Sequence, residues 1–224
     1  MMLELNYMHE TASYSGEGMA ITYGKFKGTV VDVGGQDVNG SLKSFFVNAG
    51  MRYICVDMVE HESVDVVVKP GDPFPFANGS IDMIISSSCF EHDPCFWMTF
   101  REMARIVKLD GYIYVSAPAN GPYHGYPGDN WRFYGDAGQA LAHWACREFE
   151  GKSYPMEVEE TFHILPHDPT KPGGYHAWID FVCVWKRVAH STEKIVDEDR
   201  KNAVKKLETY LRTVKGCQTV KMSK

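Results

Sequence analysis

The feature of the sequence that most constrains the fold is a β-branched run that ends in two adjacent glycines. The segment V-V-D-V-G-G-Q-D-V-N-G-S occupies residues 30–41. Residues 29–33 have the composition of a buried strand, and the apolar residues after position 41 recur at helical spacing. The segment therefore predicts a strand, a tight turn at Gly34 and Gly35, and the start of a helix.

The predicted turn has the properties of an anion-binding or cofactor-binding site. Glycine permits backbone conformations that other residues avoid, and it lets a ligand approach the main chain closely. A helix that begins directly afterwards points unpaired N–H groups at the same place. We therefore expect a nucleotide-type cofactor here, although the pattern is not the G-x-G-x-x-G of dinucleotide-binding proteins. A simple chain reversal in an α/β sheet is the alternative interpretation.

A carboxylate follows at the end of the next predicted strand. Residues 52–57, R-Y-I-C-V-D, have the pattern of a second buried strand that ends in Asp57. In a βαβ unit this strand end lies beside the glycine turn, and an acid about 20 residues after the turn accepts hydrogen bonds from ribose hydroxyls. Asp57 is the candidate for that role, and a plain strand-end turn is the alternative.

The rest of the chain alternates between strand and helix patterns. Further strands are predicted at residues 64–68, 81–86 and 112–116, and a long antiparallel pair is predicted at 156–165 and 176–188. One helix is predicted to begin at Pro94 and to end at Asp110 and Gly111, and another is predicted at 137–148. Asp93 is the predicted N-cap of the first of these helices, and Asp136 with Gln139 predicts a capping box for the second. This order indicates an α/β fold, namely a Rossmann-like open, mostly parallel seven-stranded sheet with helices on both faces and a C-terminal antiparallel hairpin.

The domain organisation follows from these patterns. Residues 29–190 form the predicted main domain, which residues 1–28 precede as a flap or helix near the glycine turn. Residues 191–224 are rich in charge, with apolar residues at helical spacing, so we expect a charged helix or a linker there.

The composition excludes several classes of protein. The net charge is −6 and no basic stripe is visible, so we do not expect nucleic acid as a partner. No run approaches the roughly 20 apolar residues of a membrane span, and no signal-peptide pattern opens the sequence, so we do not expect a membrane partner. The six cysteines form no C-x-x-C pair, which favours reduced thiols in a soluble, cytoplasmic protein.

Taken together, the motifs of residues 29–118 resemble those of the class I S-adenosylmethionine-dependent methyltransferases. The matching stretches are V-V-D-V-G-G, the V-D pair that ends in Asp57, F-P-F-A-N-G-S-I-D-M-I-I-S-S-S-C-F-E-H, and R-E-M-A-R-I-V-K-L-D-G-Y-I-Y-V-S-A-P. Two positions depart from the family pattern. A third glycine of the first motif is replaced within Q-D-V, and a proline-glycine pair after the helix is replaced by Leu109 and Asp110.

The resemblance implies S-adenosyl-L-methionine as the cofactor and assigns roles around it. Gly34 and Gly35 would face the methionine part, and Asp57 would bind the ribose. The other implied contacts are Asp32, which would orient the turn; Gln36, Asn39 or Ser41, which would receive the amino-acid end; Met58 and Asp72 near the adenine; and Ser86 or Ser87 on the methionine side.

Two groups of polar residues are candidates for the acceptor side. Methyl transfer requires alignment of the acceptor with the methyl group, and an alcohol acceptor must also lose its proton to a base or to a hydroxyl polarised by a metal. Open α/β sheets place substrates at the carboxyl ends of their strands. The two groups in such places are Glu91, His92 and Asp93 after the fourth strand, and His124, Asp129 and Arg132 after the fifth.

The loop H-G-Y-P-G-D-N-W-R-F-Y after the fifth strand suits a sugar acceptor. An aromatic ring of Tyr126 or Trp131 could carry the apolar face of a sugar, while Asp129 and Arg132 meet its hydroxyls. The loop is also similar to those of methyltransferases in glycan and surface-polysaccharide pathways. We therefore predict O-methylation of a sugar or glycan, with His124 as general base, Asp129 binding a hydroxyl or a divalent metal such as Mg²⁺ or Mn²⁺, and Glu91 as a further catalytic candidate.

Structural roles are the alternative for several of these residues, and other functions remain open. His92 could stabilise the fold, His124 could cap the loop, and Trp131 could hold it down. A small-molecule or lipid-head-group methyltransferase has the same fold, and a nicotinamide-dependent oxidoreductase would share the turn and Asp57. The chain could also bind its cofactor without turnover or act as a module of a larger glycan-assembly protein.

Overall fold

The computed structural model describes residues 27–38, 40–125, 127–165 and 178–189, with Gly16, Gly18 and Thr22 before them and the backbone of a strand at 218–221. The predicted flap at residues 1–28 and the predicted charged helix at 191–224 therefore fall largely outside the described residues. The two strands of the late pair are described, whereas most of the connection between them is not.

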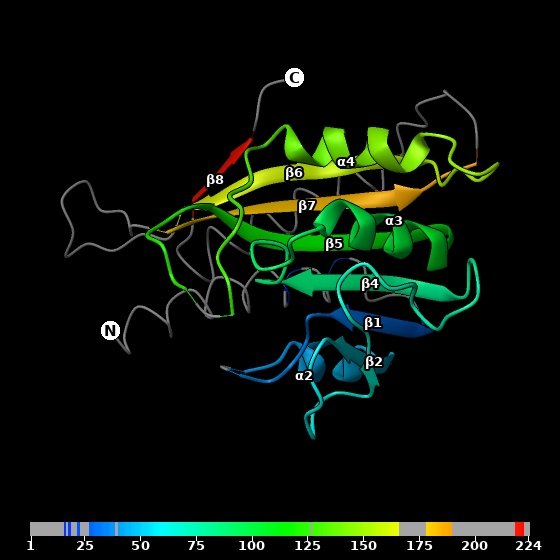
Figure 1. Cartoon of the computed structure of the whole chain (residues 1–224), viewed down its shortest axis with the longest axis horizontal. Coiled ribbons are helices and arrows are strands. Elements are labelled where there is room, and N and C mark those ends of the chain that lie inside the picture. The colour runs from blue at the N-terminus through cyan, green and yellow to red at the C-terminus, as the bar shows by residue number, and fades with distance from the viewer. Residues whose placement is uncertain are drawn as a thin grey trace.

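The described strands form one mixed sheet (Figure 1), in the order β3-β2-β1-β4-β5-β7-β6-β8. The strands are β1 (Thr29–Val33), β2 (Arg52–Asp57), β3 (Val66–Val67), β4 (Ile81–Ser87), β5 (Val107–Asn120), β6 (Met156–Leu165), β7 (Ile179–Arg187) and β8 (Gln218–Lys221). The strands from β3 to β5 are parallel, and β7 and β6 continue the sheet in antiparallel pairings. The predicted Rossmann-like fold with a C-terminal hairpin is confirmed, and β8 adds an edge strand that the sequence did not predict.

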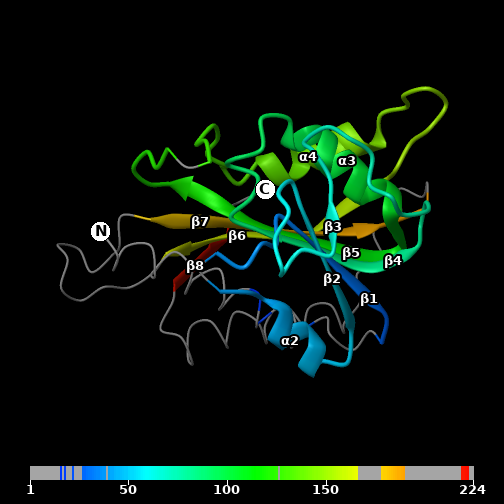
Figure 2. The ribbon, with the colours of Figure 1, turned by 60° about the horizontal axis from the view of Figure 1, so that its bottom comes forward.

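Helices cover both faces of the sheet, as Figure 2 shows. They are α2 (Lys43–Asn48) on one face, and α3 (Phe96–Ile106) and α4 (Ala137–Cys146) on the other. Successive strand residues point to opposite faces. Val30 and Met83 accordingly pack in the cluster that includes Phe46 of α2, whereas Val31 and Ile84 pack in the larger cluster beneath α3 and α4. None of the helices in the described part of the chain is both long and apolar enough to span a membrane.

Three details of the helix ends differ from the sequence prediction. Helix α3 begins at Phe96, two residues later than predicted. The Asp93 carboxylate instead accepts a hydrogen bond from the Cys95 backbone N–H at 2.8 Å. Asp136 precedes α4 with helical backbone angles and makes no side-chain cap, so the predicted capping box is wrong. A cap requires an extended backbone at this position, which the sequence alone does not show.

The end of α3 also differs from the prediction. The helix stops at Ile106 and β5 begins at once, so that Asp110 and Gly111 lie inside the strand rather than at a helix end. A side chain at Gly111 would come within 2.8 Å of the Asp82 carbonyl oxygen. The close approach of two strands therefore requires glycine at this position, and the predicted role of Gly111 in ending the helix is wrong.

Candidate active site

The glycine turn closes the carboxyl end of β1. The Gly34 backbone N–H donates to the Val56 carbonyl at 2.8 Å, which ties the turn to the end of β2. Gly34 has φ +75, and a Cβ built on it would lie 2.4 Å from Cys89 Sγ. Only glycine satisfies both conditions, because other residues avoid this region of φ and none lacks a Cβ.

Asp57 connects the turn to the end of β2. One carboxylate oxygen accepts a hydrogen bond from the Gln36 backbone N–H at 3.1 Å, and the other accepts one from the Met58 backbone N–H at 2.7 Å. Each carboxylate oxygen has more than one lone pair, so Asp57 keeps accepting capacity for a ligand hydroxyl. The structure thus places Asp57 and Gln36 together at the turn.

Asp32 supports the turn from beneath. Its side chain is buried, and the Tyr53 hydroxyl donates to it at 2.5 Å. Burial raises the pKa of Asp32 to about 7, against the opposing effect of the Tyr53 hydrogen bond and with a further increase from the charge of Asp57. A Cβ at Gly35 would lie 2.7 Å from the Asp32 side chain, so this carboxyl packs directly against the turn.

The other predicted cofactor residues lie in different surroundings. Ser86 is fully buried and its hydroxyl donates to the Val33 carbonyl at 2.8 Å, which leaves Ser87 as the better candidate for a ligand contact. The Ser87 hydroxyl is buried without a hydrogen-bond partner among the described residues. Met58 is exposed beside Asp57, Asp72 lies in an exposed turn, and Ser41 lies at the start of α2. Asn39 lies outside the described residues, and the ligand contacts of all of these residues stay predictions.

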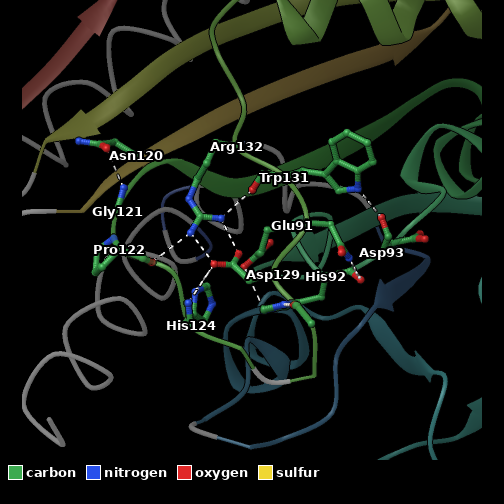
Figure 3. Close-up of polar contacts among 12 residues, drawn as sticks. Glu91, His92, Asp93, Asn120, Gly121, Pro122, His124, Asp129, Trp131 and Arg132 are labelled. Atoms are coloured by element: carbon green, nitrogen blue, oxygen red, sulfur yellow. Dashed lines mark hydrogen bonds and ion pairs between the residues drawn. The ribbon is translucent and has the colours of Figure 1, made fainter.

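The two polar groups on the acceptor side form one cluster. The Glu91 carbonyl accepts hydrogen bonds from the backbone N–H groups of Asn130 at 2.7 Å and Trp131 at 3.2 Å. The Asn130 side chain donates to the His92 carbonyl at 2.8 Å, and the Trp131 indole N–H donates to the Asp93 carbonyl at 2.9 Å. Three consecutive carbonyls after β4 therefore hold the loop that follows β5, as Figure 3 shows.

Asp129 and Arg132 brace that loop from within. The guanidinium donates to both Asp129 oxygens, at 2.5 and 2.7 Å, and also to the carbonyls of Trp131 and Pro122 at 2.8 and 3.1 Å. The Arg132 hydrogen bonds lower the pKa of Asp129 to about 2, despite the opposing effect of burial. Asp129 is therefore ionised at neutral pH, and one of its oxygens also accepts the His124 backbone N–H at 3.0 Å.

These contacts argue against direct substrate binding by Arg132 and Trp131. All four terminal N–H groups of the Arg132 guanidinium are engaged with the protein, and its fifth donor, the Nε–H, is buried without a hydrogen-bond partner among the described residues. The Trp131 indole points away from His124 in Figure 3 and packs edge-on against Phe96, with ring centroids 5.5 Å apart. We therefore assign both residues to positioning of the loop. Tyr126, the other predicted sugar contact, lies outside the described residues.

Glu91, His92 and His124 form the part of the cluster with uncommitted polar atoms. The Glu91 side chain is fully buried, and burial raises its pKa to about 8, with the charges of Asp180 and Asp129 adding to the increase. The His92 Nδ1 donates to the Gly128 carbonyl, and burial lowers the pKa of His92. The His92 and His124 rings meet edge to face, with centroids 5.0 Å apart. His163 lies on β6 outside this group, and His167 and His176 lie outside the described residues.

Trp178, just before β7, belongs to this site and was not predicted from the sequence. Its ring lies 5.4 Å from the His124 ring and beneath the Arg132 guanidinium at 5.8 Å, measured between centres. Gly121 has φ +139, and a Cβ there would overlap the Trp178 ring. The glycine that opens the loop is the one signal in the sequence that could have indicated a bulky neighbour.

The sheet places the glycine turn and the acceptor-side cluster at the same edge. Strand β4 lies between β1 and β5 and is parallel to both, so the carboxyl ends of all three strands are adjacent. Cys89 packs against Gly34 only two residues before Glu91. A ligand on the turn and a ligand at the cluster would therefore be neighbours, which is the arrangement a group-transfer reaction needs.

Comparison with known proteins agrees with this geometry. A family model described as "Methyltransferase domain" matches residues 36–115, from the glycine turn to the middle of β5. Residues 36–115 of this chain are therefore similar to a methyltransferase domain. The match includes Asp57 and Glu91, whereas the loop from His124 to Arg132 lies beyond it.

Curated proteins with similar sequences are described as uncharacterized methyltransferases. One from Mycobacterium sp. (strain JLS) is 32% identical over 108 residues, which cover 44% of this chain and 42% of the relative. Another, from Mycobacteroides abscessus, is 29% identical over 135 residues, which cover 54% and 51%. The chain spans about half the length of the curated relatives that it matches, so the likeness concerns that part alone.

Solved structures show the same fold at low sequence identity. A Burkholderia thailandensis 1,6-didemethyltoxoflavin-N1-methyltransferase matches with a TM-score of 0.56 at 12% identity, covering 82% of this chain and 81% of that enzyme. A protein from Pyrococcus horikoshii matches with a TM-score of 0.55 at 14% identity, covering 80% of this chain and 91% of its own. At such identities, the likeness concerns the fold alone.

Proposed function

We propose that this chain transfers a methyl group from S-adenosyl-L-methionine to a hydroxyl group of a sugar or glycan. The observation that carries the proposal is the packing of Cys89 against Gly34, which brings the glycine turn beside the segment that contains Glu91 and His92. A donor held by the turn would lie next to the histidines of the cluster.

The cofactor part of the proposal is supported by the turn itself. Gln36 and Asp57 are joined by a hydrogen bond at the place where this fold class binds a ribose. The Burkholderia thailandensis enzyme with the similar fold was solved with S-adenosylhomocysteine bound. The absence of the G-x-G-x-x-G pattern from residues 34–40 favours this cofactor over a nicotinamide dinucleotide.

In the proposed reaction, His124 acts as the general base. The acceptor oxygen attacks the methyl carbon as the carbon–sulfur bond breaks, the hydroxyl proton passes to His124, and S-adenosylhomocysteine is released. The Asp129 carboxylate lies 3.1 Å from the His124 Nδ1 and is ionised, so it would stabilise the imidazolium that this step produces. Arg132 fixes Asp129 in place through two hydrogen bonds.

The preference for a sugar is supported by the character of the loop. Tyr123 precedes His124 in sequence and is 78% exposed, so its ring offers a flat apolar face on which a sugar could lie. The loop therefore combines an exposed aromatic ring with a histidine next to a carboxylate. A larger glycan-assembly protein would be a natural context for such a domain, and this is part of the same proposal.

Two measurements test the proposal in sequence. We expect calorimetric titration to show micromolar binding of S-adenosylhomocysteine and no binding of NADH. Release of S-adenosylhomocysteine is then measured with panels of nucleotide sugars, glycosides, phenols and small amines, each with and without Mg²⁺ or Mn²⁺, because either ion could polarise the hydroxyl. Turnover confined to sugar hydroxyls is the expected result. Binding of NADH alone contradicts the cofactor, and a preference for phenols or amines contradicts the acceptor.

A further inference from the structure

The cluster at the ends of β4 and β5 contains buried polar atoms that no hydrogen bond satisfies. Among the described residues, both carboxylate oxygens of Glu91 and the Nε of Arg132 are buried without a hydrogen-bond partner. The buried Nδ1 of His124 also makes no hydrogen bond, although an Asp129 oxygen lies 3.1 Å from it. A buried polar group without a partner costs roughly 1–3 kcal/mol, and a charged group costs more. Such groups gathered at one point indicate a missing ligand at that point.

The orientation of His92 makes the arrangement more specific. The Gly128 carbonyl can only accept a hydrogen bond, so the His92 Nδ1 carries the proton and the Nε2 of the neutral ring presents a lone pair. That Nε2 lies 3.5 Å from a Glu91 oxygen, which is also an acceptor. Two acceptors that face each other require a proton or a cation between them. A histidine whose second nitrogen donates to a backbone carbonyl is also the usual form of a metal-binding histidine.

The spacing and the local charge also suit a cation. One potential ligand atom from each of Glu91, His92 and His124 lies within 4.8 Å of the others. Ligand atoms about 2.0–2.2 Å from a shared ion are at most about 4 Å apart, so small side-chain rotations would complete the site. The positive charge of Arg132 acts on Glu91, but its paired hydrogen bonds to Asp129 neutralise it. A cation bound there would favour the ionised form of Glu91, which burial otherwise disfavours.

We propose that Glu91, His92 and His124 bind one divalent transition-metal ion at the carboxyl ends of β4 and β5. Two imidazole nitrogens and one carboxylate are ligands that suit Zn²⁺, Fe²⁺, Co²⁺ or Mn²⁺, whereas Mg²⁺ prefers oxygen ligands alone. Three protein ligands leave at least one coordination position for an exchangeable group.

The role of the ion rests on the proposed function, whereas the ion site itself does not. If the chain methylates a hydroxyl group, the acceptor oxygen would take the open coordination position, and the metal would lower the pKa of that hydroxyl. His124 cannot then accept the proton through the nitrogen lone pair that binds the metal. The presence of the ion therefore decides whether His124 acts as a base or as a metal ligand.

The test measures metal binding directly and not through activity. The purified chain is stripped with a chelator and titrated with Co²⁺, with visible d–d absorption as the signal, and then with Zn²⁺ in competition with a chromophoric chelator. We expect one ion per chain, a Co²⁺ spectrum typical of nitrogen and oxygen ligands, and no displacement by Mg²⁺. Glu91→Gln and His92→Gln should each weaken Zn²⁺ binding by at least about tenfold.

Two further variants test whether surface histidines or misfolding explain the measured affinities. His143 is exposed on α4, away from the cluster, so His143→Gln controls for binding by surface histidines and should leave the affinity unchanged. Glu91 is fully buried and its substitution could disturb folding, whereas His124 is partly exposed on a loop. His124→Gln should therefore weaken Zn²⁺ binding while circular dichroism shows a native fold.

The outcomes separate the metal site from the proposed function. The inference is overturned if the stripped chain binds no Co²⁺ or Zn²⁺ in a one-to-one complex, or if the Glu91, His92 and His124 variants bind as tightly as the wild type. Methyl transfer by a chain that binds no metal leaves the proposed function in place and returns His124 to the role of base. Tight metal binding without any methyl transfer leaves the ion site in place and removes the proposed function.

Discussion

The glycine turn and the acceptor-side cluster lie at the same edge of the sheet, but they are built in different ways. The turn is made by residues 33–57, and its hydrogen bonds use backbone groups together with the Asp57 carboxylate. The cluster is assembled from the segments after β4 and β5 and from Trp178 before β7, and it retains buried side-chain atoms without partners. Local backbone geometry therefore fixes the shape of the turn. Contacts between segments that are distant in sequence fix the positions of the side chains in the cluster.

This comparison predicts that binding and chemistry can be separated by mutation. Changes in the turn should abolish cofactor binding, and changes in the cluster should slow transfer while cofactor binding survives. The predictions below start from the substitution with the largest expected effect.

The largest effect is expected for His124→Gln. Loss of the proton acceptor should lower kcat by about 10²–10⁴-fold, and the affinity for S-adenosylhomocysteine should not change because the turn is untouched. Single-turnover kinetics and calorimetry measure the two quantities. His143→Gln on α4 is the control and should match the wild type in both. A wild-type rate for His124→Gln would remove this residue from the chemistry.

The next effect concerns Gly34→Ala. The new Cβ would lie 2.4 Å from Cys89 Sγ at a φ of +75, so the turn must shift. We expect the affinity for S-adenosylhomocysteine to fall by about 100-fold or more, which corresponds to about 3 kcal/mol. Gly50→Ala is the matched control, because its φ is +89 and nothing lies within 4 Å of the added Cβ. If both variants lose the same affinity, the packing of Gly34 is not what shapes the turn.

Arg132→Lys tests whether the cluster depends on its brace. Lysine cannot make the paired hydrogen bonds to Asp129 or reach the carbonyls of Trp131 and Pro122 at the same time. We expect a loss of about 1–3 kcal/mol in the free energy of unfolding and a raised KM for the acceptor, with cofactor affinity unchanged.

Arg101→Lys is the matched control for this brace. Arg101 also donates to several backbone carbonyls, among them those of Arg147 and Lys152, on a part of the domain that the candidate site does not use. The Arg101→Lys variant should lose a comparable free energy of unfolding without any change in the acceptor KM. An acceptor KM that rises equally in both variants would show a general effect of lower stability.

The last prediction is a pH dependence of stability that arises in the turn. The pKa of Asp32 is about 7 in the folded chain, above its usual value of 3.8, so the folded state binds more protons between these values. Stability from this group is therefore greatest below about pH 4 and is lost as the pH rises through about 7, with a slope of at most about 1.4 kcal/mol per pH unit. Denaturant unfolding at pH 5 and pH 8 measures the difference. Asp32→Asn should reduce it, and an unchanged slope in that variant would contradict the assignment.

The sequence was sufficient for the elements that are coded locally. The seven predicted strands are present because each segment is rich in β-branched, aromatic or other apolar residues. Asp57 lies beside the glycine turn because parallel strand ends adjoin. The capping box at Asp136 was wrong because the residue has helical backbone angles, and residue types do not report those angles.

The sequence by itself determined the sheet, the glycine turn and the kinds of side chain available for chemistry. Only the tertiary structure decided which of those side chains are free to act. The terminal N–H groups of Arg132 are occupied by Asp129 and two carbonyls, and Trp131 turns toward Phe96, whereas both oxygens of the buried Glu91 have no hydrogen-bond partner among the described residues. The reason is physical: hydrogen-bond capacity is a property of the residue, but whether that capacity is already used depends on neighbours that the fold brings together from distant parts of the chain.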